Sequence, residues 1–369
     1  MPGREVYVIL PGDIDDPAAP SGGNTYDRHV CRGLAGLGWA VREHPVAGAW
    51  PRPAPAARAA LARVLAGLPD HAVVLLDGLV ASAVPEVLAP EAQRLRLVVV
   101  VHMPLGDETP NDRPREWLAL SCATAVIVTS DWARRRLLEL YGVPADRVHV
   151  AVPGVHPGPV ARGSDTGSRL LCVAAVTPLK GHDLLTRALA GIADLSWSCL
   201  CVGALDKDRG FVERLSRQTT AYGLADRVRF CGPRTGADLD AAYAAADLLV
   251  LASRSETYGM VVTEALARGL PVVTTAAKGL PEALGRAPDG SLPGVLVPPD
   301  DPPALAGALR RWLGDPDLRR RLRRAARARR DTLTGWSETS RLISAVLDAC
   351  PDHAGSLPGN HAADPRSAG

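Results

Sequence analysis

Two glutamates, Glu256 and Glu264, are the side chains whose type and spacing best suit chemistry on a ligand. They are eight residues apart, which is about two helical turns, so they can face the same side of one element. Ionised carboxylates only accept hydrogen bonds and therefore suit hydroxyl groups. Glutamates are also common on helix surfaces, and the spacing alone favours two solvated side chains. The surrounding residues must decide between the two interpretations.

The segment that carries the pair predicts the carboxyl end of a buried strand. Residues 247–253 are mostly apolar, and a turn at Tyr258-Gly259 leads into a helix that we expect to begin near Met260. Ligands of open α/β sheets bind at the carboxyl ends of strands, and helix N-termini attract phosphates. Phosphate donors flanked by two hydroxyl acceptors suit a nucleotide sugar.

The whole string from Ser253 to Val273 resembles the signature of retaining glycosyltransferases of the GT-B fold, in the family 4 that includes bacterial mannosyl- and glucosyltransferases. In that family the first glutamate approaches the donor sugar and the second holds the ribose. The intervening glycine and hydrophobic residue present amides to the diphosphate. The resemblance thus implies a donor site that includes Glu256, Tyr258, Gly259, Met260, Val261 and Glu264, with Glu256 also catalytic.

Lys180 lies in a Lys-Gly turn just after the first strand of the second half. Such a turn places an ammonium group beside a helix N-terminus, although an isolated Lys-Gly is usually a surface turn. Its position matches the family's Gly-Arg-x4-Lys-Gly element, which implies donor binding and a catalytic part for Lys180. The match has one departure, because Ala174-Ala175 stand where the family has Gly-Arg. Arg254 is a candidate to replace the missing guanidinium.

Three further residues or pairs are implied by the resemblance. Gly22-Gly23 follow the first strand, where paired glycines allow a close backbone approach to a ligand, and the family's loop there faces the donor diphosphate. His102 follows the apolar run 97–101 and resembles the acceptor-side histidine, which would orient the acceptor rather than act as an obligatory base. Arg234 follows the run 228–231, where a basic side chain would stack on the nucleobase. Glu282 begins a helix and is expected to complement its dipole.

These residues need a scaffold of parallel strands, and the pattern of apolar runs predicts one. Between the runs of the first half lie helical patterns at 26–37, 56–68 and 130–141, which makes one doubly wound unit. The second half repeats the plan. The predicted strands are 5–10, 73–77, 97–101, 125–129 and 148–152, then 169–176, 197–202, 228–231, 247–251, 271–274 and 294–297. The fold class is therefore α/β, with two doubly wound Rossmann-like domains; the resemblance adds that they face a cleft, as in GT-B.

We expect an N-terminal acceptor-binding domain at 1–160 and a C-terminal donor domain at 168–330. Turn residues concentrate between 153 and 168 and predict an interdomain linker. The segment 331–350 contains an amphipathic helix that, by resemblance, packs back on the first domain. The tail 351–369 lacks periodic apolar residues, so we expect it to be disordered.

Composition excludes several classes of partner. The formal net charge of the 369-residue chain is +2, which gives no general attraction to nucleic acid or membrane. The basic run 319–330 has no interleaved aromatics, and we interpret it as a solvated face enriched by a GC-rich genome. The seven cysteines contain no Cys-x-x-Cys pair, and Cys199 and Cys201 fit buried strand positions. The N-terminus enters a strand at once, and no apolar run is long enough to span a membrane. We therefore expect a cytoplasmic protein without a metal site or cofactor, for which membrane association is disfavoured.

The sequence as a whole predicts a retaining, metal-independent hexosyltransferase that uses a UDP or GDP sugar. The acceptor, a small molecule or a glycan, stays open, as do the transferred sugar and the oligomeric state. Two alternatives stay open as well: a GT-B nucleotide-sugar epimerase, and a non-catalytic nucleotide-sugar-binding homologue, which the alanine at Ala175 favours. A dinucleotide oxidoreductase is disfavoured, because neither first strand-to-helix turn carries Gly-x-Gly-x-x-Gly.

Overall fold

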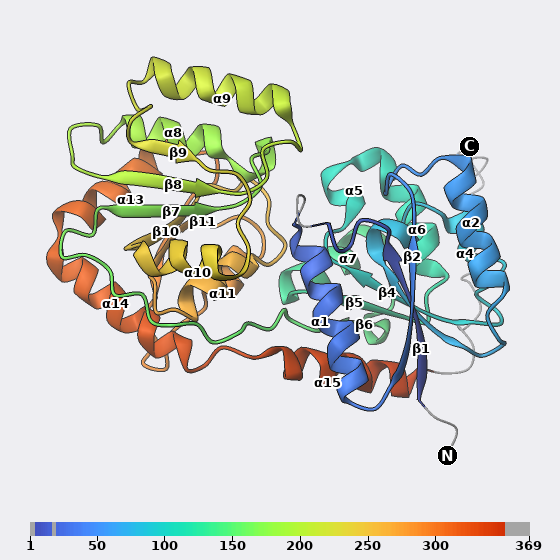
Figure 1. Cartoon of the computed structure of the whole chain (residues 1–369). Helices are drawn as coiled ribbons and strands as arrows, with labels where there is room; N and C mark the ends of the chain where they lie inside the picture. Colours follow the sequence, from blue (N-terminus) through green and yellow to red (C-terminus); the bar gives the residue numbers. More distant parts are fainter. Residues whose placement is uncertain (1–3, 17–19, 351–369) are drawn as a thin grey trace, which may run out of the picture.

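The computed structural model of the chain describes residues 4–16 and 20–350. The first domain is built on a six-stranded sheet in which all pairings are parallel, in the order β2-β1-β3-β4-β5-β6 (Figure 1). Its strands are β1 (Glu5–Pro11), β2 (Ala40–Val46), β3 (Val73–Asp77), β4 (Arg96–Val101), β5 (Ala125–Val128) and β6 (Val148–Val150). Its helices are α1 (Gly22–Gly36), α2 (Pro55–Ala66), α3 (Gly78–Ala81), α4 (Pro85–Leu88), α5 (Leu105–Glu108), α6 (Arg113–Ser121) and α7 (Asp131–Tyr141), with single 3-10 turns η1 (Pro110–Asp112) and η2 (Ala145–Arg147).

The second domain repeats the arrangement in the order β12-β11-β10-β7-β8-β9, again with parallel pairings. Its strands are β7 (Arg169–Val173), β8 (Ser198–Val202), β9 (Val228–Phe230), β10 (Leu248–Leu251), β11 (Val272–Thr275) and β12 (Gly294–Val297). Its helical elements are η3 (Pro178–Lys180), α8 (His182–Ala190), α9 (Arg209–Ala221), α10 (Gly236–Ala245), α11 (Met260–Leu266), α12 (Leu280–Leu284), α13 (Pro302–Gly314) and α14 (Pro316–Arg330). The predicted α/β class with two doubly wound domains is confirmed.

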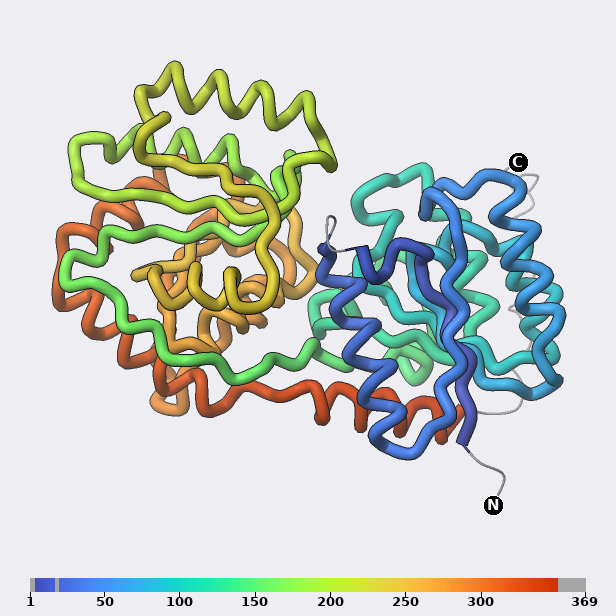
Figure 2. The backbone as a smooth tube through the Cα atoms, viewed as in Figure 1, coloured from blue at the N-terminus to red at the C-terminus, as the bar shows by residue number. Residues whose placement is uncertain are grey.

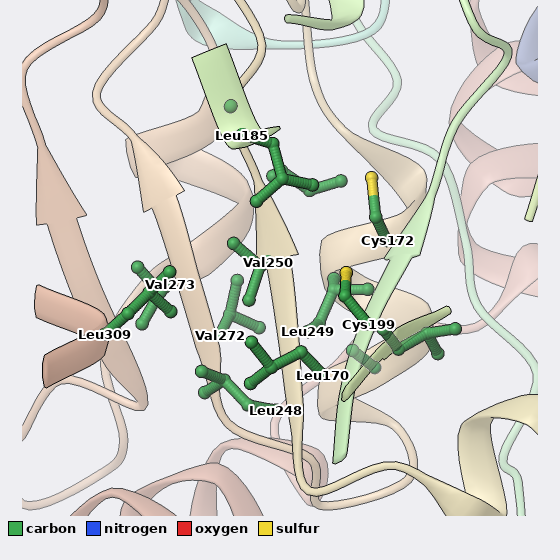
Figure 3. Close-up of a cluster of buried hydrophobic side chains, with 14 of the residues drawn as sticks. Leu170, Cys172, Leu185, Cys199, Leu248, Leu249, Val250, Val272, Val273 and Leu309 are labelled. Atoms are coloured by element: carbon green, nitrogen blue, oxygen red, sulfur yellow. The ribbon is translucent and has the colours of Figure 1, made fainter. Parts of the chain in front are cut away.

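Both sheets are buried on both faces, which explains why their strands are continuous apolar runs. Along β4, Leu97, Val99 and Val101 pack into one core cluster, whereas Val98 and Val100 pack into another on the opposite face. In the second domain, buried apolar side chains likewise surround β7, β10 and β11 (Figure 3). Burial of each Val or Leu side chain contributes about 1.5–3 kcal/mol to the free energy of folding relative to an exposed one. These strands therefore hold the edge of each sheet in a fixed position.

The chain passes between the domains twice. The linker before β7 runs beside the segment that follows α14, and the amide of Val155 donates to the carbonyl of Thr334 at 3.0 Å (Figure 2). The last helix, α15 (Trp336–Ala349), then lies along α1 of the first domain. There the Trp39 Nε1 donates to Ser344 Oγ at 2.9 Å, with both side chains buried. The tail expected to be disordered, 351–369, lies outside the described residues.

Several details differ from the sequence-based expectations. The edge strand β2 was not predicted, because it is polar and largely exposed and contains Pro45. Helix α1 begins at Gly22 rather than at residue 26, so the glycine pair forms its first turn, capped by Ser21, whose side chain accepts from the Asn24 amide at 3.0 Å. Strand β7 ends at Val173 instead of continuing to 176.

The interpretation of the basic run 319–330 as a solvated face is wrong for part of it. Arg319 is buried and donates to the carbonyls of Trp312 and Leu313. Arg323 donates to the carbonyl of Ser164 at 2.8 Å, within the interdomain linker. Arg323 therefore holds the linker against the second domain, whereas Arg319 joins α14 to the end of α13. Within the described ranges, no helix combines the length and apolar character needed to cross a membrane.

Candidate functional site

One cavity of about 660 Å³ lies between the two domains and is lined by both. All the residues that the sequence assigned to catalysis or donor binding line it. The first domain contributes Gly22, Gly23 and His102, and the second contributes Lys180, Arg234, Glu256, Tyr258, Gly259, Met260, Val261 and Glu264. The structure therefore brings these predicted site residues together from widely separated segments of the sequence.

The position of the cavity follows from strand order. In the second sheet the strand order changes direction between the neighbours β7 and β10, so the connections that follow these two strands run to opposite sides. Ligands of open α/β sheets bind in the crevice at such a point. Val173 and Leu251, the last residues of these two strands, both line the cavity. In the first sheet the reversal lies between β1 and β3, and α1, which follows β1, directs its first turn at the same cavity.

Glu256 lies in the segment between β10 and α11, so the two glutamates do not share a helix. Gly259 gives this segment its shape, with φ of +99°, and an added Cβ would lie 2.6 Å from the side chain of Leu280. Only glycine fits there. Glu256 Oε2 accepts a hydrogen bond from Lys180 Nζ, in a pair that is partly exposed to the cavity. Two of the charged residues predicted for the donor site, Lys180 and Glu256, are thus each other's partners.

Glu264 lies on α11 and has a different environment. The hydroxyl of Tyr243 donates to Glu264 Oε2 at 2.7 Å. Burial raises the pKa of Glu264, although the Tyr243 hydrogen bond and the nearby Arg268 charge act in the opposite direction. Arg268 in turn stacks over the Tyr243 ring, with its guanidinium carbon 4.6 Å from the ring centroid. The carboxylate is held in one orientation at the cavity wall.

His102 is held by two aspartates that sequence reasoning missed. Its Nε2 lies 2.9 Å from Asp27 Oδ1 and 3.4 Å from Asp77 Oδ2. Burial lowers the pKa of His102, but the charges and hydrogen bonds of Asp27 and Asp77 outweigh it and raise the pKa to about 10. Burial is also the main reason that the pKa of Asp27 rises to about 6. The ring edge packs against Gly23, where an added Cβ would lie 3.2 Å from His102 Cδ2.

A signal for Asp27 exists in the sequence. Asp27 shares the helical stripe of Val30, Cys31 and Leu34, all of which are buried. An acid at an i, i+3, i+4, i+7 position of an apolar face needs a buried partner. Asp77 ends β3, which neighbours β4, so the sheet-edge rule that selected His102 also applies to it.

Arg254 does not replace the missing guanidinium. It donates to both carboxylate oxygens of Asp183, at 2.9 and 2.7 Å, and to Asp300 at 2.8 Å, and it is not part of the cavity wall. Ala175 does line the cavity. So does Lys207, a basic residue that the sequence did not single out because it lies in an exposed turn without a motif.

Direct contacts join the domains around the cavity. The hydroxyl of Thr257 donates to the carbonyl of His102 at 2.7 Å, and the hydroxyl of Ser130 donates to the carbonyl of Thr257 at 2.7 Å. Glu282 accepts from the amides of Asp131 and Trp132, at 2.9 and 3.1 Å, at the start of α7. Glu282 lies in the first turn of α12, as expected for a residue that complements its own helix, and it also caps a helix of the other domain.

A group of three side chains with metal-binding atoms lies in the core of the second domain, away from the cavity wall. Cys172, His182 and Cys201 are buried, and their ligand atoms lie within 4.8 Å of one another. They come from β7, α8 and β8, so no spacing in the sequence reveals them. Cys199 and Cys201 are buried as predicted. The expectation that the chain uses no metal stays a prediction.

Comparison with known proteins identifies relatives over both halves. A family model described as "Glycosyltransferase Family 4" matches residues 3–158, and one described as "Glycosyl transferases group 1" matches residues 162–329. The D-inositol 3-phosphate glycosyltransferases of Thermomonospora curvata and Kineococcus radiotolerans are 36% and 34% identical over 241 and 248 residues, or 58% and 61% of this chain. These matches span 54% and 57% of the relatives' own length.

Solved structures share the whole fold. A sucrose-phosphate synthase from Thermosynechococcus elongatus has a TM-score of 0.74 at 22% identity, covering 94% of this chain and 98% of that one. The HepE protein of Anabaena, solved with UDP and glucose, has a TM-score of 0.75 at 19% identity, covering 94% and 100%. With these glycosyltransferase folds, the two family matches show that the chain belongs to the glycosyltransferases of family 4 and group 1, which have the GT-B fold.

Proposed function

We propose that this protein transfers a sugar from a nucleotide-diphosphate sugar, with UDP or GDP as the nucleotide, to a hydroxyl group of an acceptor. The observation that carries the proposal is the cavity at the edges of both sheets, in which the predicted catalytic and donor-binding residues meet. The HepE structure, which was solved with UDP and glucose, supports a UDP donor. The names of the relatives point to a phosphorylated cyclitol as the first acceptor to test.

In this proposal the second domain binds the donor. Glu264, held by Tyr243, accepts hydrogen bonds from the ribose hydroxyls, and Arg234 contacts the base. The backbone amides of Met260 and Val261 and the ammonium of Lys180 bind the diphosphate. Because Lys180 already pairs with Glu256, diphosphate binding draws Lys180 away and leaves the Glu256 carboxylate for the donor sugar.

The first domain positions the acceptor. His102 lines the cavity with Nε2 held by Asp27 and Asp77, so Nδ1 is the ring nitrogen left for a ligand. An imidazolium donates hydrogen bonds and cannot take up a further proton. We therefore assign His102 to orienting the acceptor, and we infer that the leaving diphosphate takes the acceptor proton on the same face, which retains the anomeric configuration without an enzymatic nucleophile.

The reaction needs no metal ion in this scheme, because amides and Lys180 supply the positive potential at the diphosphate. We place the enzyme in the cytoplasm. All seven cysteines are unpaired, which suits a reducing compartment.

The test is a matrix of donors and acceptors. UDP- and GDP-sugars are incubated with the protein, with and without inositol and inositol 3-phosphate, and released nucleotide and products are resolved by mass. Acceptor-dependent release with one new glycosidic product supports the proposal, and NMR of that product reports the anomeric configuration. Conversion of the sugar without any acceptor would show an epimerase. Binding of UDP or GDP without turnover of any donor would show a non-catalytic homologue.

A further inference from the structure

Position 175 faces the cavity without a charged side chain, and a neighbouring loop lies against it. The amide of Ala174 donates to the carbonyl of Val202, and the amide of Val176 donates to the carbonyl of Ala204, both at 2.9 Å. Between them, an added Cβ at Gly203 would lie 1.9 Å from the carbonyl oxygen of Ala174. The connection after β7 and the connection after β8 are therefore in direct backbone contact at the cavity.

Lys207 lies four residues beyond Gly203 in that second connection and lines the same cavity. Its side chain is exposed, and it makes no hydrogen bond or ion pair with any residue in the described ranges 4–16 and 20–350. The neighbouring acid Asp208 is already used, because it caps α9 by accepting from the Phe211 amide at 2.8 Å. The Lys207 charge is thus available to a ligand.

The other cationic side chains in this part of the second domain are less available to a ligand near position 175. Lys180 follows Ala175 in the β7-to-α8 connection but pairs with Glu256. Arg254 is held by Asp183 and Asp300. Arg234 also lines the cavity, but it enters from the connection that follows β9, one strand further from β7 than the connection that bears Lys207.

We propose that Lys207 binds the diphosphate of the donor and supplies, from the loop after β8, the positive charge that position 175 lacks. This assignment rests on the proposed function. An ammonium group is a point charge on a flexible stem, so Lys207 reaches the diphosphate without the fixed geometry that a guanidinium at position 175 would impose.

The test measures affinity for UDP, GDP and UMP by calorimetry in wild type and in Lys207→Ala. A lost hydrogen bond to a charged partner corresponds to about a tenfold change or more. We expect UDP and GDP to bind roughly tenfold more weakly to the variant, with a smaller change for UMP, which lacks the second phosphate. Arg209→Ala removes a nearby exposed cation outside the cavity wall and should leave all affinities unchanged.

Two further variants separate charge from shape. Lys207→Arg should keep most of the UDP affinity, and Ala175→Arg should restore it in the Lys207→Ala background. Arg234→Ala should weaken UDP and UMP equally, as expected for a contact to the base.

The assignment is overturned if Lys207→Ala binds UDP and GDP like wild type, or loses UMP affinity to the same extent. Should Ala175→Arg fail to fold, the comparison of UDP with UMP in Lys207→Ala alone decides. Wild-type protein that binds neither nucleotide diphosphate would instead overturn the proposed function, and the role of Lys207 with it. UDP binding that weakens in Lys180→Ala but not in Lys207→Ala rejects only the second cation.

Discussion

Thr257 donates its hydroxyl hydrogen to the carbonyl oxygen of His102 across 2.7 Å, and so ties the loop of Glu256 to the strand end that carries the histidine. The two residues belong to different domains and both line the cavity. The bond therefore couples the two walls of the cavity across the boundary between the domains.

Thr257→Val tests this coupling, because valine keeps the shape and removes the donor. An unpaired carbonyl costs about 1–3 kcal/mol. We expect the acceptor KM to rise several-fold and the radius of gyration in solution scattering to increase, while affinity for UDP changes little. Thr220→Val, which removes a hydrogen bond within α9, is the control. Unchanged scattering together with unchanged kinetics would show that the bond does not hold the domains.

The two glutamates should give different kinetic results. Glu256→Gln removes the partner of Lys180, so affinity for UDP should hold or increase while kcat falls at least about tenfold. Glu264→Gln should weaken UDP binding itself, because it disturbs the acceptor held by Tyr243. Glu213→Gln, on the exposed face of α9, serves as the control. The roles are wrong if either variant retains full turnover with the best donor.

The pH dependence should follow the Asp27–His102 pair. The pKa of Asp27 is about 6 and that of His102 is about 10, so both are charged between these values. Activity should fall as the pH drops through about 6 and Asp27 takes up a proton. In Asp27→Asn this acidic limb should disappear, and the pKa of His102 should move down because it has lost a negative neighbour. NMR titration of the ring measures it, with His102→Gln to assign the signal. An identical acidic limb in Asp27→Asn would assign it to another group.

Chelation should leave turnover intact. Amides and lysines bind the diphosphate in the proposed scheme, so activity in excess EDTA should stay within about twofold of the untreated protein. Metal analysis of the purified protein addresses the Cys172–His182–Cys201 group separately. Complete loss of activity with EDTA and recovery with Mg²⁺ or Mn²⁺ would reject the metal-free scheme.

The contact of α15 with the first domain should contribute measurably to stability. Ser344→Ala leaves the buried Nε1 of Trp39 without its acceptor, and we expect the free energy of unfolding of the first domain to fall by about 1–3 kcal/mol. Denaturant unfolding followed by tryptophan fluorescence measures the change. Ser337→Ala, at an exposed position of the same helix, should have little effect. Equal effects of the two substitutions would contradict the assignment.

The sequence predicted the frame of the fold because buried parallel strands are continuous apolar runs, as in β3, β4 and β10. It did not predict β2, an edge strand whose exposed side chains carry no such pattern. Short helices such as α3 and α5 have too few residues to show a period.

For the site, the predicted residues were those in local motifs, and they do line one cavity. The sequence did not reveal the contacts that depend on the order of the strands and on the packing of the domains. Asp27 and Asp77 meet His102 only because α1, β3 and β4 are neighbours in space, and Glu282 meets α7 through the contact between the two domains. Lys207 has no motif at all, and its position follows from the pairing of β7 with β8.

The crossing of α15 has a consequence for biosynthesis. The ribosome makes all six strands of the first sheet before the second domain, but the helix that covers α1 comes after both. Until residues 336–349 emerge, the apolar surface around Val30, Leu34 and Trp39 lacks the cover that Ile343 and Leu347 provide. The core on this face of the first domain is thus completed only after the second domain has been made, and until then the nascent chain exposes an apolar surface of the kind that favours aggregation.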